Sequence, residues 1–292
     1  MKKYILSIYI ICITQIAYAE LPLTVENLIS DKGKIAMELS MIYGNNKTGT
    51  TRTGEYISVQ ISENSFINIP TAIRNEQLQN EYLISNIGIK YGLMQNLDIS
   101  LKANLLYNSN RFIDIESSNK SQHDTNISDI SLGTNYQFIE DNKYPALVGF
   151  IETAIFEKGQ NRNSIFSSWS AGLTTYRSYD PIVLSLTYGY KYTLKRKVED
   201  KITYKMADLF FMNPQIAFAA NDNISLISGL NFKYQGNQKI NNRIVQKKRN
   251  NLDYSFGIGY GINDSSNLNL VTTIRQDFDN SNEVRLNYIK KF

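Results

Sequence analysis

The chain is built from repeated segments in which apolar and polar residues alternate with a period of two. The clearest example is residues 252–262, and the same alternation recurs in residues 97–107, 130–138 and 182–192. Successive side chains of a β-strand point to opposite faces, so this period predicts strands with one apolar and one polar face. Segments of about ten residues are long enough to cross a bilayer as tilted strands. Soluble strands are mostly shorter.

The connections between these segments alternate between short and long. The short, turn-rich connections are residues 92–96, 140–143, 177–181, 220–223 and 263–267. The long, polar connections are residues 108–126, 157–164, 194–206 and 235–250. Outer-membrane barrels have short periplasmic turns and longer extracellular loops. The sequence therefore predicts an all-β fold, a transmembrane antiparallel up-and-down β-barrel that spans residues 33–292.

The number of strands follows from parity, because both ends of a bacterial barrel wall lie in the periplasm and the count is even. The pattern predicts twelve strands, the first over residues 33–43. A β-like piece at residues 56–61 has no place in this count and is assigned to a hairpin-like excursion of the first extracellular loop. The alternative is fourteen strands, with another strand between Phe66 and Gln79.

The two ends of the chain predict export to the outer membrane. A basic start, an apolar stretch over residues 4–16 and the small residues Ala17 and Ala19 are typical of a cleavable signal peptide, residues 1–19. Residues 20–32 are then a periplasmic N-terminal segment. At the other end, the aromatic residue Phe292 falls on the apolar phase of the last strand. This resembles the signal read by the barrel-assembly machinery, although Lys290 interrupts the phase.

Composition narrows the possible partners and cofactors. Cys12 lies inside the predicted signal, so the mature chain has no thiol. Signal cleavage leaves 29 basic against 27 acidic residues, a balance that gives no reason to expect nucleic acid as a partner. The 20 tyrosines and 13 phenylalanines suit aromatic girdles at two membrane interfaces. Without a mature cysteine or a pair of histidines, no metal or other cofactor is expected.

Several turn-and-strand signatures resemble a known family. They are the segments IKYGL at 89–93, NLDISL at 96–101, DISLGTNYQF at 129–138 and DPIVL at 180–184. Together they resemble the outer-membrane family of transporters of the meta-pathway of phenol degradation, over about residues 34–292. The resemblance implies a barrel that takes up hydrophobic aromatic compounds. It implies no catalytic residues.

Enzymatic function is not expected. Outer-membrane phospholipases and proteases need a histidine held close to a nucleophile or an acid. The single histidine of the chain, His123, falls in residues 118–125, which the pattern assigns to a polar extracellular loop. A lone histidine in a loop gives no such geometry.

Charged residues on the polar phase of the strands are the candidate site. The predicted lumen-lining residues are Glu38, Lys90, Asp98, Lys102, Asp129, Glu152, Lys191, Lys233, Asp253, Arg275 and Arg285. They could orient polar or ionic solutes, or pair across the lumen and fill it. In residues 144–156, Phe150 and Glu152 share one face, which leaves the phase of that strand open. A count of twelve strands lies between the small barrels that side chains fill and the larger barrels that enclose an aqueous channel. The number of strands therefore does not decide between an open and a filled lumen.

The sequence thus predicts a channel or transporter-like outer-membrane barrel for small solutes, including hydrophobic or aromatic ones. The alternative is a closed structural or surface-interaction barrel. Two long connections are basic, and their cations are Lys195, Arg196, Lys197, Lys201, Lys205, Lys239, Arg243, Lys247, Lys248 and Arg249. On the cell surface these could contact the phosphates of lipopolysaccharide, or they could simply be solvated. The expected partners are therefore outer-membrane lipid, lipopolysaccharide, the assembly machinery and a small solute.

Overall fold

A computed structural model shows the arrangement of the strands. It describes residues 28–48, 56–70, 77–113, 120–158, 163–199, 202–275 and 282–292. The predicted signal peptide and most of the predicted periplasmic segment lie outside these ranges. Within them, no helix is long and apolar enough to cross a membrane.

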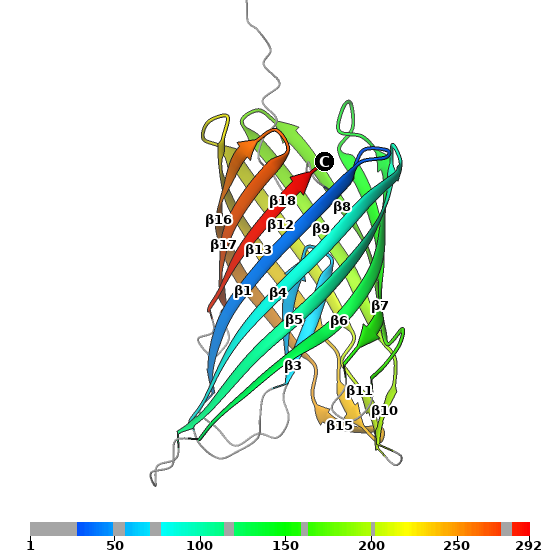
Figure 1. Ribbon diagram of the computed structural model, residues 1–292, viewed down its shortest axis with the longest axis vertical. Helices are drawn as coiled ribbons and strands as arrows, with labels where there is room; N and C mark the ends of the chain where they lie inside the picture. Colours follow the sequence, from blue (N-terminus) through cyan, green and yellow to red (C-terminus); the bar gives the residue numbers. More distant parts are fainter. Residues whose placement is uncertain are drawn as a thin grey trace, which may run out of the picture.

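Twelve antiparallel strands form a closed barrel (Figure 1). They are β1 (Ile35–Thr48), β4 (Gln77–Met94), β5 (Leu97–Ile113), β6 (Lys120–Ile139), β7 (Ala146–Glu157), β8 (Ser168–Tyr179), β9 (Ile182–Thr193), β12 (Leu209–Ala219), β13 (Ile224–Gln235), β16 (Arg249–Asn263), β17 (Ser266–Arg275) and β18 (Asn282–Lys291). The first and last strands pair and close the wall. The predicted count of twelve is confirmed, and fourteen is wrong because the two extra strands between β1 and β4 do not join the wall.

The wall turns its apolar side outward. On β16, Phe256 and Ile258 are about half exposed, whereas Asp253 and Ser255 on the alternate phase are buried. This is the reverse of a water-soluble sheet, whose apolar face packs on a core. A closed wall leaves no unpaired strand edge, which lipid could not satisfy. The apolar band therefore suits contact with acyl chains.

The short connections lie at the end of the barrel where the C-terminus lies (Figure 1). At the opposite end, the strands continue beyond the predicted limits. Residues 108–126 were expected to be a loop, but β5 runs to Ile113 and β6 begins at Lys120. The prediction failed because polar composition marks only where a hairpin leaves the membrane, and strand pairing continues beyond that point. Polar composition does not mark where the hydrogen-bonded ladder ends.

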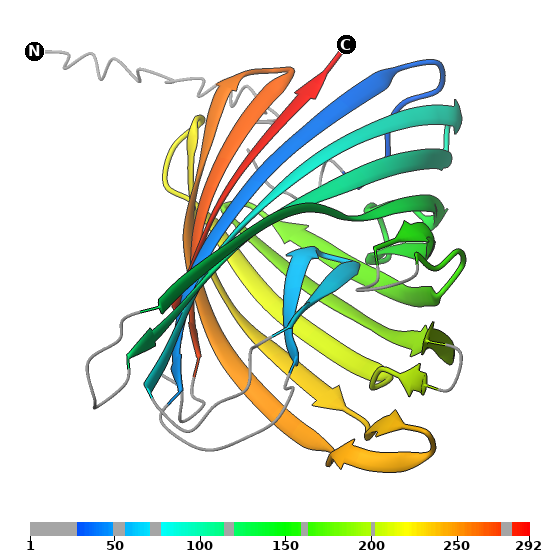
Figure 2. The same cartoon turned by 60° about the horizontal axis from the view of Figure 1, so that its bottom comes forward.

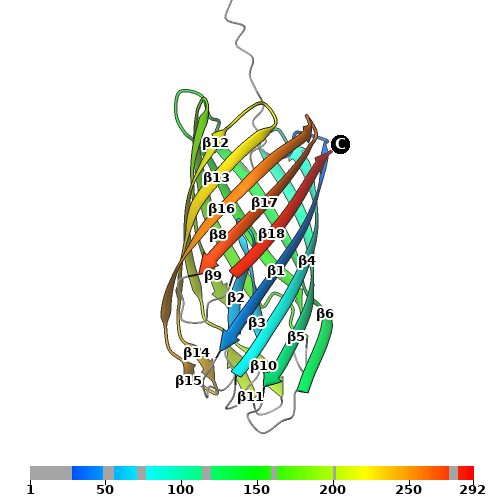
Figure 3. The same cartoon turned by 90° about the vertical axis from the view of Figure 1, so that its left-hand side faces the viewer.

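A hairpin from the connection between β1 and β4 lies inside the barrel. Its strands are β2 (Tyr56–Ser62) and β3 (Ser65–Pro70), which pair with each other and project into the lumen (Figures 2 and 3). The excursion at residues 56–61 is therefore a hairpin, as predicted. Its position within the lumen was not predicted.

The two basic connections combine in one small sheet beyond the barrel wall (Figure 3). This sheet has the order β10 (Arg196–Glu199), β11 (Ile202–Lys205), β14 (Gln238–Ile240) and β15 (Arg243–Gln246). β11 and β14 join the two halves through the pair Tyr204 and Ile240. We call this the outer sheet. It brings together two charged segments that are distant in sequence.

Candidate functional site

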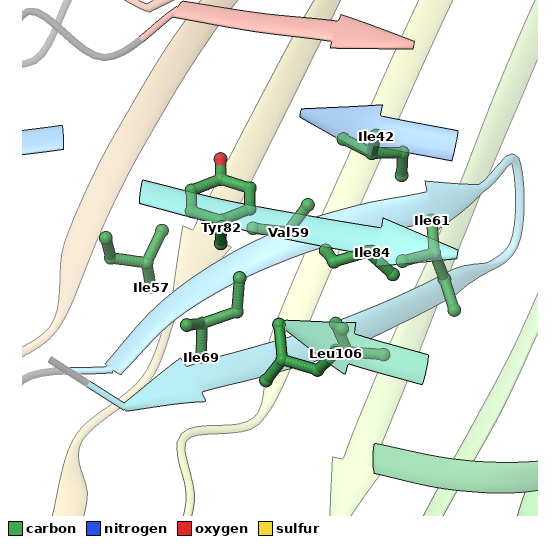
Figure 4. Packing of buried hydrophobic residues seen from close by; sticks show 9 residues of the cluster. Ile42, Ile57, Val59, Ile61, Ile69, Tyr82, Ile84 and Leu106 are labelled. Atoms are coloured by element: carbon green, nitrogen blue, oxygen red, sulfur yellow. The ribbon is translucent and has the colours of Figure 1, made fainter. Parts of the chain in front are cut away.

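The barrel interior is the candidate site, and the β2–β3 hairpin is its largest feature. One face of the hairpin is aliphatic and packs against inward-facing residues of β1, β4 and β5 (Figure 4). The buried residues of this cluster are Ile42, Ile57, Val59, Ile61, Ile67, Ile69, Tyr82, Ile84 and Leu106. The aliphatic face of the hairpin thus covers the inner side of β1, β4 and β5.

Three basic residues from three different wall strands hold the hairpin by its polar atoms. Lys191 of β9 donates from Nζ to the carbonyl oxygen of Phe66 at 2.5 Å. Arg285 of β18 donates to the carbonyl oxygen of Gln60. Lys102 of β5 donates to Ser62 Oγ at 3.3 Å. These contacts fix the hairpin across the lumen as well as along the wall that it covers.

Lys102 also forms a buried ion pair with Glu152, with 3.0 Å between Nζ and Oε2. The two residues belong to β5 and β7 and reach each other across β6. Gly133 of β6 lies beneath this contact. A Cβ atom there would lie 2.8 Å from Ser100 Oγ and 3.5 Å from Glu152 Cγ. The glycine therefore gives the pair the space to lie flat on the inner wall.

A second group of charges runs around the wall from β13 to β4. Lys233 Nζ lies 3.1 Å from Asp253 Oδ2, and Arg275 Nε lies 4.0 Å from the same oxygen. Arg275 also pairs with Glu283, which accepts a 2.5 Å hydrogen bond from the Tyr82 hydroxyl. Sequence reasoning missed Glu283 and Tyr82. Glu283 shares the inward phase of Arg285 on β18, and this phase was the signal that could have found it.

The remaining predicted residues are held by weaker or neutral contacts. Glu38 and Lys90 face each other at 3.9 Å, a long distance for an ion pair. Asp129 Oδ1 accepts a 2.9 Å hydrogen bond from Asn104 Nδ2. Asn104 in turn accepts one from Asn86. These amides link β4, β5 and β6 on the inner face.

The segment before β1 enters the opposite end of the lumen. The backbone N–H of Ser30 donates to Asp98 Oδ2 at 3.2 Å, and Asn135 donates to Asp98 Oδ1 at 2.7 Å. Leu28 packs against buried Val183 and its neighbours on β12 and β13. The segment therefore extends from β5 toward the far wall. It narrows the end of the barrel where the short turns lie.

Aromatic side chains gather on the other face of the hairpin. The rings of Phe66 and Phe211 have centroids 4.8 Å apart, and Phe150 lies 6.4 Å from Phe211. Phe150 shares the inner face of β7 with Glu152, and both are buried. This settles the strand phase that the sequence left open. A Cβ atom at Gly172 would lie 2.4 Å from the Phe150 ring, so this close approach of ring and wall requires glycine.

A cavity of about 130 Å³ lies between the hairpin turn and the barrel wall. Its lining includes Glu63 and Asn64 of the turn, together with Asn213, Arg285 and Asn287 of β12 and β18. Burial raises the pKa of the Glu63 carboxyl, because removal from water disfavours its charged form. The cavity is polar and carries both signs of charge. It is therefore suited to polar contents.

His123 does not lie in a loop as predicted. It is part of β6, where it is exposed and stacks against Tyr107, with 3.1 Å between Tyr107 Oη and His123 Nδ1. In the described part of the chain, no group of three or more His, Cys, Asp or Glu is placed to hold a metal ion. The interior offers ion pairs and amide hydrogen bonds as its chemistry.

Comparison with known proteins gives similarity in fold. The COG4313 outer membrane channel from Pseudomonas putida F1 aligns with a TM-score of 0.62 and 10% identity, over 90% of this chain and 97% of the channel. The translocator domain of the autotransporter NalP from Neisseria meningitidis aligns with a TM-score of 0.53 and 10% identity, over 90% of each chain. No family model and no curated protein matches the sequence.

At this level of identity the alignments establish the fold alone. The chain is a closed antiparallel barrel of twelve strands that resembles outer-membrane channels. This fold supports an outer-membrane location.

Proposed function

We propose that the protein is an outer-membrane channel for small solutes. The observation that carries the proposal is a polar cavity inside a closed barrel, beside a hairpin that covers only part of the wall. A solute would pass beside the hairpin turn, through the cavity lined by parts of β12, β13 and β18. The purified protein in planar bilayers is expected to give discrete conductance steps. A barrel that stays electrically silent and passes no solute into liposomes contradicts the proposal.

The sequence resemblance suggests hydrophobic aromatic compounds as the solute class, which we propose as one candidate. The cluster of Phe66, Phe150 and Phe211 beside the hairpin supports it, because aromatic rings favour offset or edge contacts with other rings. Liposome uptake of phenol and toluene tests this idea. If replacing Phe150 by Ala leaves the uptake rate unchanged, the aromatic cluster does not lie on the route of these compounds.

A closed structural barrel is the second candidate. Its support is the set of buried ion pairs, which join adjacent or next-but-one strands of the wall instead of leaving their charges open to solutes. Both candidates predict a folded outer-membrane barrel. The conductance measurement separates them, since a closed barrel should not conduct in the intact form.

We further propose that the outer sheet contacts lipopolysaccharide. It combines cations with apolar residues that are about half exposed, among them Ile244 and Val245. Phosphate groups would meet the cations, and acyl chains would meet the apolar side chains. A variant with Lys239, Arg243, Lys247 and Lys248 changed to Gln should bind lipopolysaccharide vesicles more weakly. It should still show the gel mobility of a folded barrel. Unchanged vesicle binding contradicts this contact.

Export and assembly complete the proposal. Cleavage after Ala19 would leave Glu20 as the mature N-terminus, which intact-mass measurement on purified outer membranes can test. Recognition by the barrel-assembly machinery would depend on Phe292, whose ring is exposed. Lys290, which interrupts the strand phase, lies with its Nζ 4.9 Å from the Phe292 ring centroid. The lysine therefore contacts the C-terminal aromatic ring.

A further inference from the structure

We propose that the cavity beside the hairpin turn is a binding site for a small zwitterionic solute. This inference rests on the proposed channel function and names the chemistry of one solute that the channel holds. The site is formed by Glu63 and Asn64 of the hairpin turn and by Asn213, Arg285 and Asn287 of the wall.

The first support is a set of buried polar atoms that belong to residues lining this cavity and have no hydrogen-bond partner in the protein. Within the described residues, these atoms are Glu63 Oε2, Asn64 Oδ1, Asn213 Oδ1, Arg285 Nε and Asn287 Oδ1. Buried polar groups are normally hydrogen-bonded, because an unsatisfied one costs about 1–3 kcal/mol. Five such atoms on the lining residues of one cavity mark it as the place where a ligand would supply the missing hydrogen bonds.

The second support is that the two charged members have opposite sign and do not satisfy each other. Glu63 and Arg285 line the same cavity, yet no ion pair joins them. Arg285 uses one nitrogen to hold the Gln60 carbonyl oxygen, which leaves Nε for another acceptor. A ligand with one cationic and one anionic end can bind the carboxylate and the guanidinium at the same time.

The neighbouring charges suit the same ligand class. Glu38 and Lys90 also line the cavity, and their 3.9 Å separation is loose for an ion pair. Lys102 and Lys233, by contrast, are held at 3.0 and 3.1 Å by Glu152 and Asp253. The mixed lining disfavours a ligand with a single charge, because such a ligand would leave either Glu63 Oε2 or Arg285 Nε without a partner.

The test compares three probes of similar size on the full mature chain in detergent micelles. The probes are 4-aminobutyrate, which carries both charges, butyrate, which has only the carboxylate, and butylammonium, which has only the ammonium. Calorimetry is expected to give roughly tenfold tighter binding for 4-aminobutyrate than for either analogue, the effect of one charge-assisted hydrogen bond. Equal affinities, or no binding of any probe, overturn the site and leave a water-filled cavity.

Two conservative variants assign the ends of the ligand. Glu63→Gln should weaken 4-aminobutyrate binding to the level of butyrate, and Arg285→Gln should weaken it to the level of butylammonium. The matched substitutions Glu140→Gln and Arg177→Gln, on a short connection and the adjacent end of β8, should leave binding unchanged. The probe comparison on the wild-type chain needs no variant, so it decides the question even if one variant fails to fold.

Conductance measured in parallel separates this inference from the channel proposal. Preferential binding by a barrel that does not conduct supports the site and ends the channel proposal. Conductance without preference among the three probes overturns the site and leaves the channel proposal standing.

Discussion

Buried charges inside the barrel depend on their partners, and Lys102 shows the consequence at the scale of one residue. We expect Lys102→Met to lower the free energy of unfolding by about 3–5 kcal/mol, because it leaves the Glu152 carboxylate buried without its cation. The double variant Lys102→Met/Glu152→Gln should recover most of this loss. Urea unfolding in detergent, followed by the fluorescence of the single tryptophan Trp169, measures both changes. Lys143→Met, on an exposed turn, is the control and should stay near wild type.

Gly44 allows a second close approach inside the wall. A Cβ atom there would lie 2.2 Å from Tyr82 Cζ, so Gly44→Ala must displace a ring that is almost fully buried. The displaced hydroxyl would then lose Glu283. We expect a loss of about 1–3 kcal/mol in unfolding free energy, the usual cost of overpacking. Gly88→Ala is the matched control, since its nearest contact would be 3.4 Å away. Equal losses in the two variants would contradict this account.

The alternating pattern suggested lumen-lining charged residues, but it missed Glu283 and could not predict the contacts among them. Lys102 and Glu152 meet across an intervening strand, and their pairing depends on the curvature of the closed wall. Tyr82 was missed for another reason. It is an aromatic residue on the inner face, where the pattern predicts polar side chains, and only the hairpin that covers it explains this placement.

At the scale of elements, the β2–β3 hairpin is held too firmly to leave the lumen by thermal motion alone. Five aliphatic hairpin residues are buried against the wall, and each contributes about 1.5–3 kcal/mol of transfer free energy. The hairpin is therefore a fixed part of the interior. A solute must pass beside it.

A charge on the buried face should release the hairpin. Val59 is fully buried, and Val59→Asp places a carboxylate among aliphatic side chains. We expect the hairpin to leave the wall and single-channel conductance to rise several-fold, whereas the barrel wall stays closed by its own strand pairing. Ile244→Asp, on the exposed outer sheet, should change neither conductance nor gel mobility. Unaltered conductance in a folded Val59→Asp barrel would show that the hairpin does not restrict the lumen.

The hairpin also shows what a search for barrel strands overlooks. Ile57, Val59 and Ile61 alternate with polar residues in a segment that parity excludes from the wall. Such an aliphatic face must be buried somewhere, and the lumen is the nearest place that can cover it. The sequence predicted the hairpin but placed it in the extracellular loop, because apolar strand residues were expected only where a strand faces lipid.

For the whole molecule, the two ends of the barrel differ, and this difference predicts the orientation of the chain in the membrane. The C-terminus and the short connections lie at one end, and the outer sheet lies at the other (Figures 1 and 3). Outer-membrane barrels have short periplasmic turns, so we expect the short connections to face the periplasm and the outer sheet to face the medium. The predicted mature chain lacks cysteine, so labelling of a single introduced cysteine can report this orientation without a background signal from native thiols.

We expect Ile244→Cys to react with a membrane-impermeant maleimide on intact cells, because this position lies on the outer sheet and is about half exposed. Asp264→Cys, in the turn between β16 and β17, should react only after the outer membrane is permeabilised. Both positions are exposed, so a difference in labelling reports sidedness and not burial. Labelling of Asp264→Cys on intact cells would show that the barrel has the opposite orientation. The hairpin would then lie at the periplasmic entrance instead of the outer one.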